Sequence, residues 1–322
     1  MTGPSNDAGS PAGSVPGSSL PPVSVIVPVY DDAPRLALCL AALARQSYPP
    51  DRVEVIVVDN GSEPPADPGA MGYPDVRTVV EPTPGSYAAR TAGIGAATAD
   101  VLAFTDSDCI PAQDWLERGV RRLLGTPDCA VVGGRVPVFP EDPDRPTSAE
   151  LYDLVTAFPM EHYVRDLHFV GTGNLFTHRR VFRRVGRFDA TLQSGGDVEW
   201  GQRVWRAGLK QVYDPDVVAR HPARRTFAEL HRKMTRVTPA GRERARNPIR
   251  AAGRVALALI PPVRYFYRLS RSPGLANRLQ GMRAMMVAIA LHYARALELA
   301  RLELGRQPRW RPVSVDSSDG PG

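Results

Sequence analysis

Two aspartates, Asp106 and Asp108, directly follow a short run of apolar, strand-forming residues at 101–105. If that run is a buried parallel strand, a spacing of two positions places both carboxylates in the crevice at its carboxyl end, where open α/β sheets bind ligands. Neighbouring carboxylates repel each other, and Mg²⁺ is commonly held by one or two carboxylates together with substrate phosphates. The pair therefore predicts a metal-dependent enzyme that acts on a phosphorylated substrate. Paired acids are also common in solvated turns, so the surrounding residues must decide.

The chain around this pair alternates between strand-type and helix-type segments. Apolar, β-branched runs predict strands at residues 23–29, 53–58, 76–80, 101–105 and 130–136, with helical spacing between them. A longer helix is expected from Thr147 to about Tyr163, and short strands are expected at 212–213 and 217–218. Strands that alternate with helices indicate an α/β fold, in which helices cover a largely parallel sheet.

Composition sets limits on compartment and on membrane insertion. The first 22 residues and residues 311–322 are rich in small and polar residues and predict a disordered leader and tail. The chain has no run of about 18 uncharged apolar residues, so no transmembrane helix is expected. The three cysteines, Cys39, Cys109 and Cys129, lack metal-site spacing, which favours a reduced, cytoplasmic compartment.

Charge is distributed unevenly along the chain. Residues 220–322 contain 21 Lys and Arg against 6 Asp and Glu, whereas residues 1–219 contain 19 against 28. The basic part includes apolar, helix-prone stretches at 251–260 and 282–300, so we expect a basic amphipathic helical segment at residues 236–310. This segment could bind an anionic membrane surface or a polyprenyl-phosphate acceptor. It could equally be a helical hairpin that packs on the catalytic domain with solvated arginines. No nucleic-acid module is recognisable, and no nucleic-acid partner is expected.

Taken in order, several motifs give the chain a specific resemblance. It resembles the family 2 inverting glycosyltransferases of the GT-A fold, a Rossmann-like mixed sheet flanked by helices that binds nucleotide-diphosphate sugars. The segments that carry the resemblance are residues 25–30, 57–62, 105–108 and 194–199, with connectors at 89–94 and 171–174. The resemblance covers residues 23–235, which we expect to be the catalytic domain. Each motif alone is weak, but six in the right order are specific.

The resemblance implies a donor site and a metal site. It assigns the nucleotide sugar to Pro28, Val29, Tyr30, Asp59, Arg90 and Asp106, and assigns Mg²⁺ or Mn²⁺ to Asp108, with His221 completing the metal shell. Alternatives stay open for three of these. Asp59 is also a common turn former after a strand. Arg90 could be a solvated helix charge, and a histidine before a proline is more often a packing residue.

The same resemblance implies an acceptor site and a general base. Asp197 is the expected base, which takes the proton of the acceptor hydroxyl, although an aspartate after two glycines is also a good helix N-cap. Residues Gly173, Asn174, Glu199 and Trp200 are expected to contact the acceptor. The chain departs from the family pattern at Gly196, where a glutamate is usual, and at Asp31 and Asn60, where asparagine and a second acid are usual. The missing glutamate puts acceptor positioning in doubt.

We therefore expect metal-dependent, inverting transfer of a sugar, from a UDP-sugar above other donors, to a glycan or lipid-linked acceptor. The expected role is synthesis of a cell-surface polysaccharide or glycolipid at the inner face of the cell membrane, with the protein cytoplasmic or peripheral. One alternative is a catalytically silent glycan- or membrane-binding module. Another is a nucleotidyltransferase, which would need a Gly-rich phosphate loop with a lysine after the first strand; residues 28–31 lack both.

Overall fold

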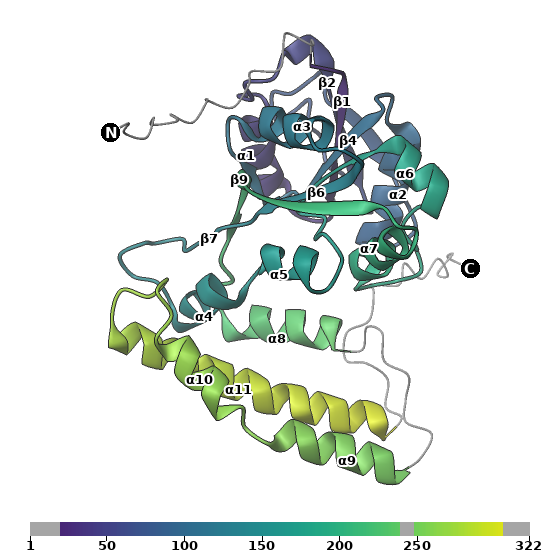
Figure 1. Cartoon of the computed structure of the whole chain (residues 1–322). Coiled ribbons are helices and arrows are strands. Elements are labelled where there is room, and N and C mark those ends of the chain that lie inside the picture. The colour runs from purple at the N-terminus through teal and green to yellow at the C-terminus, as the bar shows by residue number, and fades with distance from the viewer. Residues whose placement is uncertain (1–19, 239–247, 305–322) are drawn as a thin grey trace, which may run out of the picture.

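A computed structural model describes residues 20–238 and 248–304 of the chain (Figure 1). Most of the predicted leader and the whole predicted tail lie outside these residues. The strands are β1 (Val23–Val29), β2 (Val53–Asp59), β3 (Arg77–Val80), β4 (Val101–Thr105), β5 (Ile110–Pro111), β6 (Cys129–Arg135), β7 (Val138–Phe139), β8 (Asn174–His178) and β9 (Lys210–Pro222). The helices of the α/β body are α1 (Ala33–Leu43), α2 (Ser86–Ala96), α3 (Trp115–Gly125), α4 (Ser148–Thr156), α5 (Met160–Arg165), α6 (Arg179–Val185) and α7 (Gly196–Arg206), with a 3₁₀ turn at Pro50–Arg52.

The strands of the described residues form one mixed sheet in the order β3-β2-β1-β4-β8-β6-β9-β5, with β7 beside β9. The strands β1 to β4 pair in parallel, and β8 is antiparallel to both β4 and β6. This arrangement confirms the expected α/β fold with a mixed sheet. Residues 212–213 and 217–218 differ from the expectation: they belong to one strand, β9, whose pairing with β6 is interrupted between Asp214 and Val218.

Apolar side chains cover both faces of the sheet. Alternate residues of β1, including Val25 and Val27, pack in a core with Leu36 and Trp115, while Ile26 points into a second core with Phe104 and Trp200. Successive side chains of a strand point to opposite faces, so a continuous apolar run such as residues 23–29 is what a strand covered on both sides requires. These two cores hold the strand ends in fixed positions.

The helix expected at Thr147–Tyr163 is two helices, α4 and α5. Between them Phe158 has φ +50°, a backbone conformation that costs a bulky residue energy, and Pro159 follows it. A residue before proline is disfavoured in the right-handed helical region, so the helix ends there. After this break, α5 packs against β6 and β9, and the Phe158 ring lies 4.8 Å from the ring of His221.

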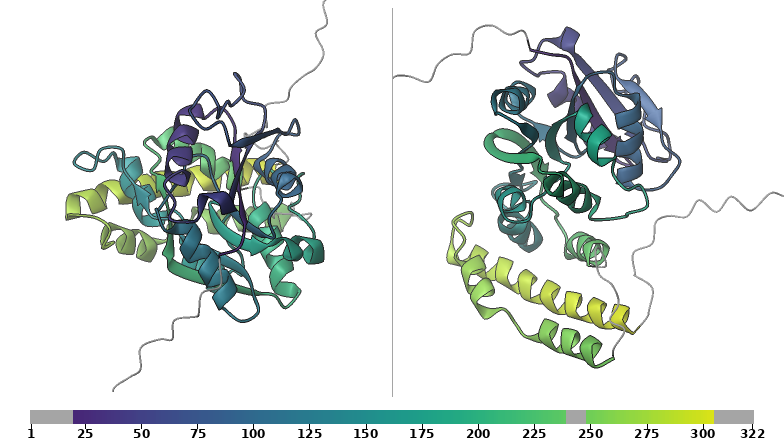
Figure 2. Two further views of the ribbon diagram at one scale, coloured as in Figure 1. Left: turned by 90° about the horizontal axis from the view of Figure 1, so that it is seen from above. Right: turned by 45° about the vertical axis from the view of Figure 1, so that its right-hand side comes forward.

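The basic segment is helical, as expected, and forms a separate layer. Helix α8 (Phe227–Val237) follows β9, and α9 (Pro248–Leu259), α10 (Val263–Ser270) and α11 (Arg278–Glu303) come next. Figures 1 and 2 show α9, α10 and α11 on one side of the molecule, with α4 and α8 between them and the sheet. The predicted boundary at residue 235 falls inside α8. Among the described residues, no helix is long and apolar enough to cross a bilayer.

Candidate functional site

A cleft of about 1080 Å³ opens at the carboxyl ends of β1 and β4. It brings together most of the residues that the sequence predicts for the site: Pro28, Val29, Tyr30, Arg90, Asp106, Asp108, Gly173, Asp197, Glu199 and His221. They come from strand ends, from α2 and from the start of α7, and are separated by up to almost 200 positions in the chain. Three further predicted residues, Asp59, Asn174 and Trp200, are not in its lining.

The acidic pair lies on the loop after β4, and each carboxylate has a basic partner. Arg90, whose side chain is 5% exposed, donates a hydrogen bond to Asp106 Oδ1. Asp108 Oδ2 lies 3.1 Å from His221 Nε2. Burial raises the pKa of Asp108, but the hydrogen bond and charge of His221 outweigh it, so the pKa lies below its ordinary value. Asp108 is therefore a carboxylate at neutral pH.

His221 is oriented so that one ring nitrogen points at the acidic pair. Its Nδ1 lies 2.6 Å from the carbonyl oxygen of Pro222 and donates its proton to that oxygen, while Nε2 points at Asp108. A backbone carbonyl that fixes one ring nitrogen is the usual way in which proteins prepare the other nitrogen for a metal. The side chain of His221 is 7% exposed, so it is not a solvated surface histidine.

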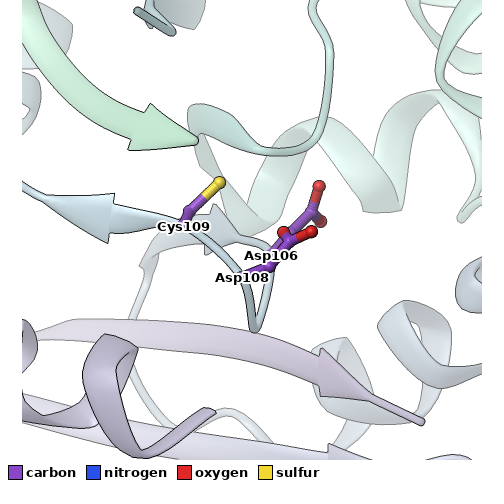
Figure 3. A group of neighbouring side chains, drawn as sticks. All are labelled: Asp106, Asp108 and Cys109. Carbon is purple, nitrogen blue, oxygen red and sulfur yellow. The ribbon is translucent and has the colours of Figure 1, made fainter. Parts of the chain in front are cut away.

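The donor set at this position fits a hard divalent cation. One ligand atom each of Asp106, Asp108 and Cys109 lies within 4.8 Å of the others, and Figure 3 shows the two carboxylates beside each other on the same loop. Burial and the nearby Asp106 charge raise the pKa of the Cys109 thiol well above its ordinary value. A protonated thiol is a poor ligand, and Mg²⁺ and Mn²⁺ prefer oxygen. Asp108 and His221, with Asp106 beside them, are therefore the residues suited to hold the ion.

Asp197 occupies the first turn of α7, after Gly195 with φ +78°. Its Oδ1 accepts hydrogen bonds from Tyr87 Oη at 2.9 Å and from the Val198 backbone N–H at 3.0 Å. Burial raises the pKa of Asp197 above its ordinary value, and the Tyr87 hydrogen bond opposes this only in part. A carboxylate with a raised pKa is a stronger base, which suits proton abstraction near neutral pH.

Tyr87 is a site residue that the sequence reasoning missed. An added Cβ at Gly196 would lie 2.7 Å from Cδ2 of the Tyr87 ring, so this ring fills the space beside Gly196. The place where a glutamate is usual thus has no room for a side chain here, and Tyr87 contacts the base instead. A signal was present: Tyr87 precedes Arg90 by three positions, which places both on one face of α2.

The three predicted residues outside the cleft have structural partners. The Asp59 carboxylate is buried and accepts backbone N–H groups of Ser62 at 3.0 Å and Ala66 at 3.1 Å, which fixes the loop after β2. Asp59 does not line the cleft, and the donor-base contact predicted for it stays a prediction. Its hydrogen bonds are those of the alternative interpretation, in which Asp59 stabilises the turn after the strand.

Asn174 and Trp200 are both fully buried. The Asn174 amide accepts a hydrogen bond from Trp115 Nε1 at 2.8 Å and donates to two backbone carbonyl groups. Trp200 donates to the Gly186 carbonyl at 3.1 Å and stacks on Phe182. Neither side chain lines the cleft, because their polar atoms have partners inside the protein, and the acceptor contacts predicted for them stay predictions.

Two other predicted residues, Glu199 and Tyr30, line the cleft, and their side chains differ in how firmly they are held. Glu199 forms an ion pair with Arg203, with its Oε1 at 2.6 Å from Arg203 Nε, which supports an orienting role and not a proton-transfer role. Tyr30 is 49% exposed at the rim, where its ring is open to stacking. The cleft also contains basic residues to which the sequence reasoning gave no role in the site, notably Lys233, Arg236 and Arg295.

Comparison with known proteins identifies the class of enzyme. The fold and the site define a glycosyltransferase of the GT-A type. The sequence profile of glycosyl transferase family 2 matches residues 24–186, about half of the chain. Glycosyltransferase AglE of Haloferax volcanii is 42% identical over 225 residues, which cover 68% of this chain and 73% of that protein. The chain belongs to glycosyl transferase family 2.

More distant similarities agree with this assignment. The pre-mycofactocin glycosyltransferase of Mycobacterium tuberculosis is 31% identical over 212 residues, which cover 63% of this chain and 43% of that protein. The structure of mannosyltransferase PcManGT from Pyrobaculum calidifontis in complex with GDP-Man and Mn²⁺ matches with a TM-score of 0.50. The match covers 88% of this chain and 74% of that chain at 22% identity, and it shows that the two share a fold.

Proposed function

We propose that the protein transfers a sugar from a nucleoside diphosphate sugar to an acceptor hydroxyl with inversion, using Mg²⁺ or Mn²⁺, in the synthesis of a cell-surface polysaccharide or glycolipid. The observation that carries the proposal is that the acidic pair Asp106 and Asp108 and the half-buried carboxylate of Asp197 line one cleft. A single base opposite a metal-type site is what a one-step displacement at an anomeric carbon needs.

The donor is proposed to lie between the end of β1 and α2. Pro28, Val29 and the exposed ring of Tyr30 would receive the base, and Asp106 would contact the ribose. Arg90 suits the diphosphate because its Nε is a buried donor without a hydrogen-bond partner among the described residues. A buried donor left without a partner costs about 1–3 kcal/mol, which a phosphate oxygen would offset.

The chemical step follows from the positions of the side chains. Asp197 would take the proton of the acceptor hydroxyl as its oxygen attacks the anomeric carbon and the bond to the departing diphosphate breaks. Tyr87 holds the carboxylate in place, and Glu199, paired with Arg203, would orient the acceptor. The divalent ion, when bound, stabilises negative charge on the departing nucleoside diphosphate. Asp108 and His221 would hold it.

We propose a UDP-sugar as the donor, with GDP-mannose as the comparison that the shared fold suggests. A screen of UDP- and GDP-sugars, scored by release of nucleoside diphosphate with and without EDTA, tests donor and metal together. Asp108→Asn is expected to remove metal-dependent donor binding in calorimetry. If no sugar nucleotide gives metal-dependent release, the alternative of a silent glycan- or membrane-binding module is favoured.

We also propose that α9, α10 and α11 place the enzyme on the inner face of the cell membrane. On α11 the exposed side chains Leu279, Met282, Met286, Tyr293 and Leu297 recur at spacings of 3, 4, 7 and 4 residues and share one face. Residues 248–304 contain nine arginines and two glutamates, and both glutamates form ion pairs with arginines. An apolar face flanked by arginines suits an anionic bilayer surface.

A further inference from the structure

Beside the main cleft lies a second hollow of about 580 Å³. The two cavities share five residues, which form the wall between them: Asp108, His221, Arg224, Lys233 and Arg236. The lining described for the second hollow includes neither the donor-side residues Tyr30 and Arg90 nor Asp197. The wall thus combines the proposed metal ligands with three cations. We call Arg224, Lys233 and Arg236 the cationic wall.

Carboxylates balance only part of the charge of the cationic wall. Asp153, with a side chain 2% exposed, lies 2.9 Å from Arg224 Nη1 and 3.9 Å from Lys233 Nζ. One carboxylate therefore serves two cations. Within the ranges 20–238 and 248–304, Arg236 has no carboxylate partner, and neither has Arg232, which also lines the second hollow. The hollow keeps a net positive charge beside the reaction site.

The ring of Phe158 lies against two of these cations, Arg224 and Lys233. Lys233 Nζ lies 5.1 Å and Arg224 Cζ 5.9 Å from the centroid of the Phe158 ring, and the His221 ring lies 4.8 Å from it. The positive φ of Phe158 shows that the chain accepts local strain to put the ring there. Burial and repulsion by Arg224, against the attraction of Asp153, lower the pKa of Lys233 to about 8. An anionic ligand would relieve this repulsion.

We propose that the cationic wall binds a phosphate group of a phosphorylated acceptor, which enters through the second hollow and presents its hydroxyl to Asp197. The inference rests on the proposed function and adds the substrate class. Convergent arginine and lysine donors around a partly buried position are the usual means of binding phosphate esters. The phosphate could belong to a lipid-linked acceptor or to a soluble phosphorylated sugar. The proposal concerns the group that they share.

The test measures binding of phosphorylated probes to the full chain saturated with Mn²⁺ and nucleoside diphosphate, so that the donor site is filled. The probes are geranyl phosphate against geraniol, and glucose 1-phosphate against glucose, measured by calorimetry. At least one phosphorylated probe is expected to bind tenfold or more tightly than its unphosphorylated counterpart. A preference for geranyl phosphate over geraniol would indicate a lipid-linked acceptor. A preference for glucose 1-phosphate over glucose would indicate a soluble phosphorylated sugar.

The paired variant is Lys233→Gln with Arg236→Gln, and the control is Arg45→Gln, an exposed arginine at the end of α1. The double variant is expected to lose the phosphate preference by tenfold or more, while the control keeps it. Equal binding of phosphorylated and unphosphorylated probes by the unaltered protein would overturn the proposal. So would an unchanged preference in the double variant, or an equal loss of nucleoside diphosphate affinity, which would place the cations in the donor site. Failure of the proposed function would instead appear as no Mn²⁺-dependent binding of nucleoside diphosphate.

Discussion

Asp197 and Tyr87 form the pair of side chains on which the proposed chemistry depends. Asp197 is half-buried in the cleft wall, and the Tyr87 hydroxyl is its one side-chain hydrogen-bond donor among the described residues. Burial favours the protonated acid, whereas the hydrogen bond favours the carboxylate. The balance leaves a pKa above the ordinary value, as a base that works near neutral pH requires.

Replacing the base separates catalysis from stability. Asp197→Asn is expected to lower the transfer rate on the order of 10²–10⁴-fold, with donor affinity changed at most a few-fold. The pKa of Asp197 is raised in the folded protein, so its contribution to stability is present below the unfolded pKa and is lost as pH rises through the folded pKa. At pH 7 the ionised group opposes folding, and the variant is expected to unfold at the same or a higher temperature. A large loss of donor affinity or a lower unfolding temperature would instead show a structural role.

Tyr87→Phe tests the hydrogen bond that the structure adds to the site. Its loss removes a donor that favours the charged carboxylate, so the pKa of Asp197 rises further. A hydrogen bond to a charged group is worth about 1.5–3 kcal/mol, so its loss is expected to move the acid limb of the pH profile of kcat/KM to higher pH. An acid limb that stays in place would mean that Tyr87 does not act on the base.

Which residues have the right chemistry could be predicted from the sequence, but which way each side chain points could not. The motifs identified Asp106, Asp108 and Asp197, the family resemblance added His221, and the structure places all four in one cleft. Gly173 and Asn174 come from one motif, yet only Gly173 lines the cleft. Asn174 begins β8, and its pairing with Thr105 of β4 turns its amide into the core. The direction of a side chain in a strand depends on the register of that strand, which the identities of two adjacent residues do not reveal.

At the scale of elements, the site depends on how closely α2 approaches the start of α7. Gly196 allows the Tyr87 ring of α2 to lie against the first turn of α7, where a Cβ would come within 2.7 Å of it. The sequence predicted both helices and the missing glutamate at 196, but not the tyrosine that fills its place. The contact joins residues 109 positions apart, and nothing local in the sequence specifies it.

A pair of glycine substitutions tests the close packing of α2 against the start of α7. Gly196→Ala is expected to cost about 1–3 kcal/mol of unfolding free energy and to lower kcat, because the new methyl group displaces Tyr87 from Asp197. Gly95→Ala, on α2, is the matched control, since its Cβ would make only ordinary contacts beginning at 3.5 Å. An alanine within a helix is favourable by up to about 1 kcal/mol, so the control is expected to be neutral or stabilising. Equal effects of the two changes in urea denaturation would contradict the close packing.

At the scale of the whole molecule, the acidic and basic parts of the chain meet at the cleft. The metal-type pair lies at the end of β4, and the cationic wall comes from α8 and from the loop between β9 and α8, at the start of the basic part. The composition showed that a basic segment exists, and its helices were predicted. The position of α8 against the site was not predicted, because helical spacing gives the face of a helix and not its neighbour.

From the exposed apolar face of α11 we predict that the intact protein binds anionic membranes. The full chain is expected to float with phosphatidylglycerol vesicles at low salt and to be released from them as ionic strength rises, because arginine attraction is screened within about 10 Å at 0.1 M salt. The triple variant Met282→Ser, Met286→Ser, Leu297→Ser is expected to remain with the soluble fraction. Leu124→Ser, which changes an equally exposed leucine on α3, is the control and is expected to float.

The comparison with neutral vesicles separates charge from apolar burial in this binding. Phosphatidylcholine vesicles offer the same acyl chains without the anionic headgroups. If both charge attraction and apolar burial contribute to binding, the protein is expected to bind these vesicles more weakly. If the full chain stays in the soluble fraction with anionic vesicles even at low salt, the membrane role is wrong. The apolar face must then be covered by another protein surface, because an exposed stripe of five large apolar side chains on one helix face is unusual for a face left in water.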